Sequence, residues 1–129
     1  MVKTIGDAVM ATFSKPDDGL HAAFDMIDRI NQMNQKKNTR EPEISIKVGL
    51  HCGTALAVTA NEVLDFFGQT INIAARVQGL AQGGEIWITN SVYNNEEIKN
   101  ILESYPRKIE KHSAILKGIK EPTIVYRIT

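Results

Sequence analysis

The sequence predicts an α+β domain with a mostly antiparallel sheet. Apolar and polar residues alternate over 44–50, which is typical of a half-buried strand. Apolar residues recur every three or four positions over 16–35, which is typical of an amphipathic helix. With the shorter apolar runs elsewhere, the predicted order of elements is ββαββαβαββ, a pattern that favours the α+β class.

Composition indicates one globular domain over residues 1–129. Apolar residues make up 43% of the chain and charged residues 23%, a mixture that argues against disorder. The 15 basic and 15 acidic residues balance, and Cys52 is the one cysteine, so nothing indicates a nucleic-acid partner or a disulfide scaffold. No apolar run approaches the ~18 residues of a membrane span. We expect a cytoplasmic domain without direct membrane contact, although its parent chain could be membrane-anchored.

The first half of the chain predicts a hairpin, a helix and two strands. Residues 1–4 and 8–13 have strand character, and Gly6-Asp7 between them suits a tight turn. Pro16, followed by two aspartates, suits the start of the helix over 16–35. A polar loop then leads to the strand over 44–50, and a turn at Gly53 leads to a second strand over 54–59.

The second half predicts two helices among short strands. An apolar stripe predicts a helix over 69–81, ended by Gly83-Gly84 and followed by a strand over 85–88. Thr89 is a suitable N-cap for a helix over 90–103. Strands over 107–113 and 123–128 flank a loop at 117–122. The residues that we expect to be buried are Ile44, Ile46, Val48, Ile73 and Val77.

Three polar clusters stand out, and each has an ordinary interpretation as well as a functional one. A carboxylate such as Asp7 on a tight turn can bind a hard cation like Mg²⁺. Equally, Asp7 can be a turn former and Lys3 a surface residue. Lys117 and Lys120 lie in a glycine-containing loop that could hold polyphosphate or simply be solvated.

The third cluster belongs to the helix after Gly68. Asn72 and Arg76 are four residues apart, so they share one helix face, offset from the apolar stripe. An amide and a guanidinium side by side could bind a ribose oxygen and a phosphate, or could form an ordinary polar surface. Asp65 stands beside Phe66-Phe67, where it could read a base edge or serve as a turn acid.

Other chemistries have weak support in the sequence. His21, His51 and His112 are scattered and lack the spacing of a zinc site. Adjacent strand residues point to opposite faces, so His51-Cys52 does not predict a catalytic thiol pair. The sequence contains no Walker motif and no GxGxxG fingerprint.

Taken together, the clusters resemble class III adenylate/guanylate cyclase catalytic domains. Residues 2–11 (VKTIGDAVMA) resemble the metal-binding hairpin of that family, and 48–53 (VGLHCG) its glycine-bounded strand. Residues 65–76 (DFFGQTINIAAR) are similar to its most diagnostic stretch. Leu116-Lys117-Gly118, with 121–126 after it, resembles its closing loop and strand. The resemblance covers residues 1–129 and implies a ferredoxin-like, palm-type nucleotide cyclase fold.

The resemblance also implies roles for individual residues. Asp7 matches the second of two metal-binding aspartates, and Lys3 with Asp65 matches the pair that reads the adenine edge. Asn72 matches the asparagine that orients the ribose. Arg76 matches the arginine that stabilises charge developing on the phosphates. Lys117 or Lys120 would hold the terminal phosphates.

The implied activity is conversion of ATP to 3′,5′-cyclic AMP and pyrophosphate with two Mg²⁺ or Mn²⁺ ions, in a homodimer with composite active sites. The family's first metal aspartate lies on a strand that precedes Lys3. We therefore expect an N-terminally truncated domain that lacks its first strand and helices and is inactive as given. The alternative is a non-catalytic, cyclase-like module that binds nucleotide or dimerises to regulate a partner.

Overall fold

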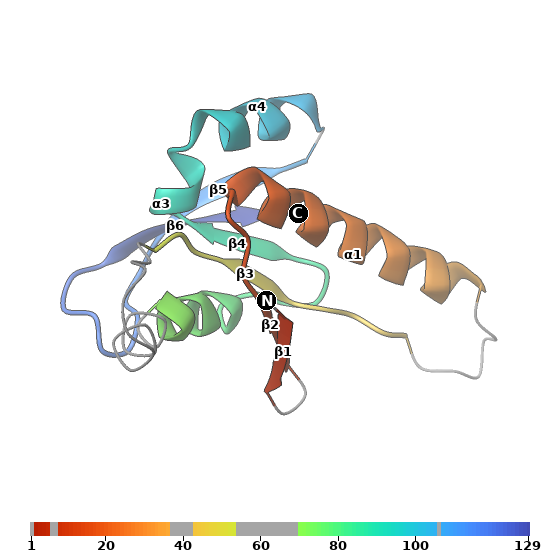
Figure 1. Cartoon of the computed structure of the whole chain (residues 1–129), viewed down its shortest axis with the longest axis horizontal. Helices are drawn as coiled ribbons and strands as arrows, with labels where there is room; N and C mark the ends of the chain where they lie inside the picture. The colour runs from red at the N-terminus through yellow and green to blue at the C-terminus, as the bar shows by residue number, and fades with distance from the viewer. Residues whose placement is uncertain (1, 6–7, 37–42, 54–69, 106) are drawn as a thin grey trace.

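A computed structural model describes residues 2–5, 8–36, 43–53, 70–105 and 107–129. Helices lie on both faces of a four-stranded sheet, and a separate two-stranded hairpin stands beside it (Figure 1). No described helix is long and apolar enough to cross a membrane. In chain order the elements are β1 (Val2–Ile5), β2 (Ala8–Ala11), α1 (Pro16–Lys36), β3 (Val48–Leu50), a helix at 70–78, β4 (Ile86–Thr89), α3 (Asn90–Tyr93), α4 (Glu96–Ser104), β5 (Ile109–Ala114) and β6 (Thr123–Ile128).

The four-stranded sheet has the order β3-β4-β6-β5 and is mixed. Strand β6 pairs antiparallel with β4 and β5, which agrees with the mostly antiparallel sheet predicted, whereas β3 and β4 are parallel. The helix at 70–78 lies between β3 and β4 in the chain, and a helical crossover of this kind returns the chain in the same direction. The α+β class is therefore confirmed, with one parallel pair added.

The predicted hairpin and first helix are present. Strands β1 and β2 pair antiparallel, with Val2 opposite Ala11 and Ile5 opposite Ala8. The expected tip at Gly6-Asp7 lies outside the described residues, as does the expected strand over 54–59. Helix α1 begins at Pro16 and buries its apolar stripe against the sheet. The buried residues of that stripe include Leu20, Ala23, Phe24 and Ile27.

The strand predicted over 44–50 is shorter than expected, and the expected burial of Ile44 is wrong. Strand β3 begins only at Val48, which is buried, while Ile46 is half-buried and Ile44 is 47% exposed. The side-chain amide of Asn34 accounts for the difference. Its Oδ1 accepts from the Ile44 N–H at 2.9 Å and its Nδ2 donates to the Ile44 carbonyl at 2.7 Å. An α1 side chain thus satisfies this backbone without a neighbouring strand.

The single helix predicted over 90–103 is also wrong, because the chain forms α3 and α4 instead. Asn95 interrupts the helix and caps α4, its Oδ1 accepting from the N–H groups of Glu97 at 2.9 Å and Ile98 at 3.3 Å. Thr89 precedes α3 in extended conformation, but its side chain makes no capping hydrogen bond. Its hydroxyl bonds to other side chains, described below.

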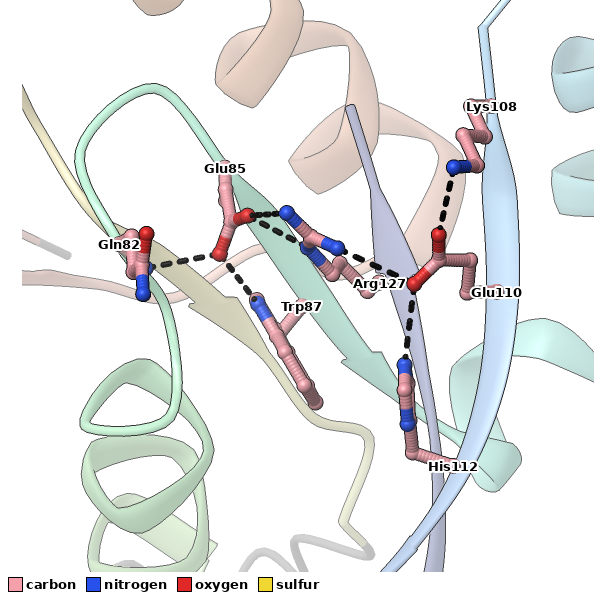
Figure 2. A network of polar contacts seen from close by, with 7 residues as sticks. All are labelled: Gln82, Glu85, Trp87, Lys108, Glu110, His112 and Arg127. Atoms are coloured by element: carbon pink, nitrogen blue, oxygen red, sulfur yellow. Dashed lines mark hydrogen bonds and ion pairs between the residues drawn. The ribbon is translucent and has the colours of Figure 1, made fainter.

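A buried carboxylate, Glu85, joins the strands on the face of the sheet opposite α1 (Figure 2). Its Oε1 accepts from the backbone N–H of Gln82 at 2.8 Å and from the indole N–H of Trp87 at 3.0 Å. Its Oε2 accepts from the guanidinium of Arg127. Burial raises the pKa of Glu85, but these hydrogen bonds and the charge of Arg127 outweigh it and hold that pKa below its usual value.

Arg127 continues the network to the neighbouring strand β5. Its Nη1 donates to Oε2 of Glu110 at 3.1 Å, and the same carboxylate contacts Lys108 at 2.9 Å and His112 at 3.2 Å. Hydrogen bonds from Lys108, His112 and Arg127 lower the pKa of Glu110 to about 2. One guanidinium therefore links a carboxylate just before β4 to a carboxylate on β5, across β6 (Figure 2).

We predict that Glu85→Gln lowers the free energy of unfolding by about 2 kcal/mol at neutral pH, because the charge beside Arg127 is lost and the amide NH2 then faces an N–H donor. The folded-state pKa of Glu85 is lowered, so its contribution is complete above its ordinary pKa of 4.5 and disappears as the pH falls through the folded value. Urea unfolding at several pH values should show the difference from wild type shrinking in acid. Glu121→Gln removes an exposed carboxylate and should change stability little at any pH.

Candidate functional site

The helix at 70–78 carries two of the predicted site residues on one exposed face. Asn72 and Arg76 are both exposed, whereas Val77 on the other side of the helix is fully buried. Ile73, which we expected to be buried, is only half-buried. The four-residue spacing therefore places the amide and the guanidinium together, as the sequence predicted.

Gly49 in β3 sets how closely this helix approaches the sheet. A Cβ atom at Gly49 would lie 2.4 Å from the backbone N of Gln78 and 2.8 Å from the carbonyl O of Ala74. Both neighbouring atoms belong to the helix backbone, which cannot turn aside as a side chain can. The absence of a side chain at Gly49 thus allows direct contact between helix and strand.

The chain that leaves the helix is fixed to β3 and to the Glu85 network. The Gly84 N–H donates to the Ile46 carbonyl at 2.8 Å, and the Val48 N–H donates to the Glu85 carbonyl at 3.1 Å. Gln82 donates to the Glu85 carboxylate, as described above. These bonds hold the C-terminal side of the helix in one position relative to the sheet.

The second part of the site is the turn between β5 and β6. The Ile119 N–H donates to the Leu116 carbonyl at 3.0 Å, and Gly118 has a φ of +86°, a value that favours glycine. Lys117 is exposed on this turn. Leu116 is buried with Val77 and Val125, so an apolar cluster joins the turn to the helix.

The helix and the turn enclose a hollow of about 120 Å³. Two cationic side chains and one amide meet there over an aliphatic floor, a combination suited to an anionic ligand with a sugar. Small-molecule pockets usually measure about 300–1,000 Å³, so the hollow is smaller than a typical ligand site. The lining residues are Asn72, Ile73, Arg76, Lys117, Gly118 and Ile119.

The structure brings together three of the seven predicted site residues: Asn72, Arg76 and Lys117. Lys120 is exposed and does not line the hollow. Lys3 lies in β1 opposite Met10, but its side chain is outside the described part of the structure. Asp7 and Asp65 also lie outside it.

The sequence did not reveal the aliphatic floor or the glycine contact. Ile73 belongs to the apolar stripe of its helix, yet it is half-buried because it also lines the hollow. Ile119 looked like an ordinary loop residue. The one available signal for Gly49 was a glycine within an alternating strand pattern, which often marks a close backbone approach.

Neither a metal site nor a reactive cysteine is present among the described residues. No three histidine, cysteine or acidic side chains there come together to hold a metal ion. His51 and Cys52 follow β3 rather than continuing it. Burial raises the pKa of the Cys52 thiol and so disfavours its nucleophilic thiolate form.

Comparison with known proteins identifies the family. Residues 1–129 match the family described as Adenylate and Guanylate cyclase catalytic domain. The chain belongs to this family. An adenylate cyclase from Anabaena cylindrica is 32% identical over 139 residues, which cover 98% of this chain and 27% of that protein. The uncharacterized protein Rv2212 from Mycobacterium tuberculosis is 30% identical over 128 residues, covering 99% of this chain and 29% of that protein.

The cyclase domain is also similar in fold to solved cyclase structures. An adenylate/guanylate cyclase/hydrolase from Silicibacter pomeroyi has a TM-score of 0.75 and 22% identity, over 99% of this chain and 70% of that one. The guanylate cyclase domain of RhGC from Catenaria anguillulae, in complex with GTP, has a TM-score of 0.63 and 23% identity, over 99% and 70%. The cyclase domain spans less than a third of the curated relatives named above.

We predict that Gly49→Ala destabilises the cyclase domain by about 1–3 kcal/mol, because the new methyl group meets the helix backbone. Hydrogen exchange should be faster at the amides of 70–78 than in wild type. Gly19→Ala is the matched control, since a Cβ in α1 would meet only side chains, Phe13 at 3.4 Å and Leu50 at 3.9 Å. The control should be neutral or stabilising, because alanine is the better helix former.

Proposed function

We propose that this cyclase domain binds ATP and, with both metal-binding aspartates of the family in place, converts it to 3′,5′-cyclic AMP and pyrophosphate. The observation that carries the proposal is the meeting of Asn72, Arg76 and Lys117 around one hollow, in a member of the cyclase family. The Anabaena cylindrica relative is named an adenylate cyclase, which supports ATP as the substrate.

In this proposal, each residue of the hollow contacts a different part of ATP. Lys117 holds the terminal phosphates as a point charge on the turn between β5 and β6. Arg76 contacts the phosphates near the reacting centre, where negative charge grows in the transition state. Asn72, one helical turn before Arg76, hydrogen-bonds the ribose and orients its 3′-oxygen for attack on the α-phosphorus.

Lys3 and Asp65 read the base in this proposal. Lysine can only donate hydrogen bonds, and an ionised aspartate can only accept them. Adenine offers a ring nitrogen that accepts and an amino group that donates, so the two side chains complement it. Guanine presents the opposite polarity on that edge, which would leave both charged groups badly paired.

Asp7 holds divalent metal in the proposed reaction. Its carboxylate is the oxygen ligand that Mg²⁺ and Mn²⁺ prefer. Metal ions of this kind, when bound, neutralise charge on the phosphates and lower the pKa of an attacking hydroxyl. The described lining of the hollow includes no carboxylate, and Asp7 itself lies outside the described residues.

We propose that two copies of the domain combine to form composite sites. The resemblance to class III cyclases, whose active sites form between two catalytic domains, supports this. Sedimentation that shows only monomer across the micromolar range would contradict a homodimer.

A second candidate is a non-catalytic module that binds nucleotide and regulates a partner. It is favoured by the hollow, whose described lining carries two cations and an amide suited to binding phosphate and sugar. Titration with ATP, beside the cyclase assay, separates the candidates. Binding without product at saturating ATP and Mn²⁺ would favour the regulatory module.

Substitution of the two loop lysines tests which one binds phosphate. We expect Lys117→Ala to raise the KM for ATP about tenfold, because it removes a charged contact at the hollow. Lys120→Ala is the matched control and should change KM less than twofold, since charges outside the site contribute little. Equal effects of the two lysine variants would contradict the assignment of Lys117.

Arg76→Ala should lower kcat about 100-fold with a smaller effect on KM.

The proposed base-reading pair also predicts which nucleotide is preferred. Cyclic nucleotide production should be faster with ATP than with GTP, because of the polarity of Lys3 and Asp65. Replacing Asp65 by Ala should reduce the ratio of kcat/KM for ATP to that for GTP by about tenfold or more. A preference for GTP in the unmodified protein would overturn the proposed base-reading pair.

A further inference from the structure

A group of hydroxyl and imidazole side chains lies where the parallel strands β3 and β4 end. His51 Nδ1 is 2.9 Å from Thr89 Oγ1, and Thr89 Oγ1 is 2.9 Å from Ser91 Oγ. Ser91 Oγ is in turn 3.3 Å from the carbonyl oxygen of Cys52 and 3.4 Å from its backbone N. Thr89 is 2% exposed, so its hydroxyl has little access to water.

The carbonyl oxygen of Cys52 only accepts, so its contact with Ser91 uses the serine proton. Ser91 Oγ also lies 3.4 Å from His51 Nδ1, so the imidazole contacts both hydroxyls. When Nδ1 carries a proton, His51 donates to Thr89 and Thr89 donates to Ser91; when it does not, Nδ1 accepts from a hydroxyl. In both tautomers the contacts join His51, Thr89, Ser91 and Cys52.

This chain of contacts ends at the segment that meets the start of the site helix. Gly53 follows Cys52, and a Cβ there would lie 2.2 Å from the Oγ1 of Thr70. Thr70 is the first described residue of the helix, and Asn72 is two residues further on. A shift of Cys52 and Gly53 would therefore displace the end of the helix that carries Asn72.

We propose that His51, Thr89 and Ser91 are positioning residues: their hydrogen-bond chain fixes the exit of β3 against Thr70 and thereby sets the position of Asn72. The proposal deepens the function proposed above and rests on it for its effect on catalysis. Its effect on the helix does not depend on activity. Gly49 and the Glu85 network fix the other end of the same helix, so the two ends have separate supports.

The test compares Thr89→Val with Thr89→Ser in the full chain. Valine keeps the shape of threonine but removes the hydroxyl, while serine keeps the hydroxyl. We expect Thr89→Val to lower kcat for ATP about tenfold, because the contacts of its hydroxyl with His51 and Ser91 are lost, and Thr89→Ser to stay within about twofold of wild type. Ser91→Ala, at an exposed position, is a second variant that should reproduce the loss if Thr89→Val folds poorly.

A double-mutant cycle with Asn72→Ala separates positioning from general support of the fold. If Thr89 acts through Asn72, Thr89→Val should cost less than about twofold in kcat once Asn72 is already alanine. An undiminished tenfold loss in that background would overturn the proposal, as would equal losses from the valine and serine variants.

Hydrogen exchange gives a readout that does not need activity. Amides at 70–73 should exchange faster in Thr89→Val than in Thr89→Ser, while Ile98 and Leu102 in α4 should be unchanged. If the unmodified chain converts neither ATP nor GTP, the proposed reaction fails, and exchange at 70–73 then decides the positioning role. Equal exchange in the two variants would overturn it.

Discussion

The contact between Glu85 and Arg127 is the interaction on which the arrangement of the site depends most. A carboxylate that is almost fully buried needs partners for its charge, and Arg127 with Gln82 and Trp87 supplies them. Those partners come from the return of the site helix, from β4 and from β6. The need to satisfy one acid therefore fixes the helix return against two central strands. Arg127 is partly exposed, and Glu110 completes its coordination from the edge strand β5.

The features that local sequence determines were predicted well. The three-to-four spacing of apolar residues predicted the end of α1 to within one residue. Gly-Asp between two apolar runs predicted that β1 pairs with β2. The four-residue spacing of Asn72 and Arg76 placed both at one hollow. In each case the periodicity of a single element is sufficient, and no distant partner has to be known.

The features that depend on distant partners could not be predicted in this way. Ile44 fitted an alternating strand, but a side chain from α1 satisfied its backbone instead. Thr89 had the right identity for a cap, yet its hydroxyl bonds to His51, 38 residues away. Glu85 and Arg127 are 42 residues apart, and nothing near either one indicates the other. The hollow forms because Val77 packs on Leu116. Nothing in the sequence near either residue predicts that these two segments are in contact.

The place of β6 in the sheet has a consequence for the order in which the molecule can assemble. This strand follows every other described element in the chain, yet it lies between β4 and β5. The hairpin and α1 involve contacts between near neighbours in the chain, which form early because little loop entropy is lost. The sheet can close only after β6 inserts, and Arg127 and Val125 arrive with it. A growing or refolding chain would therefore have its first helix long before it has a binding hollow, and ligand could select only molecules in which the insertion is complete.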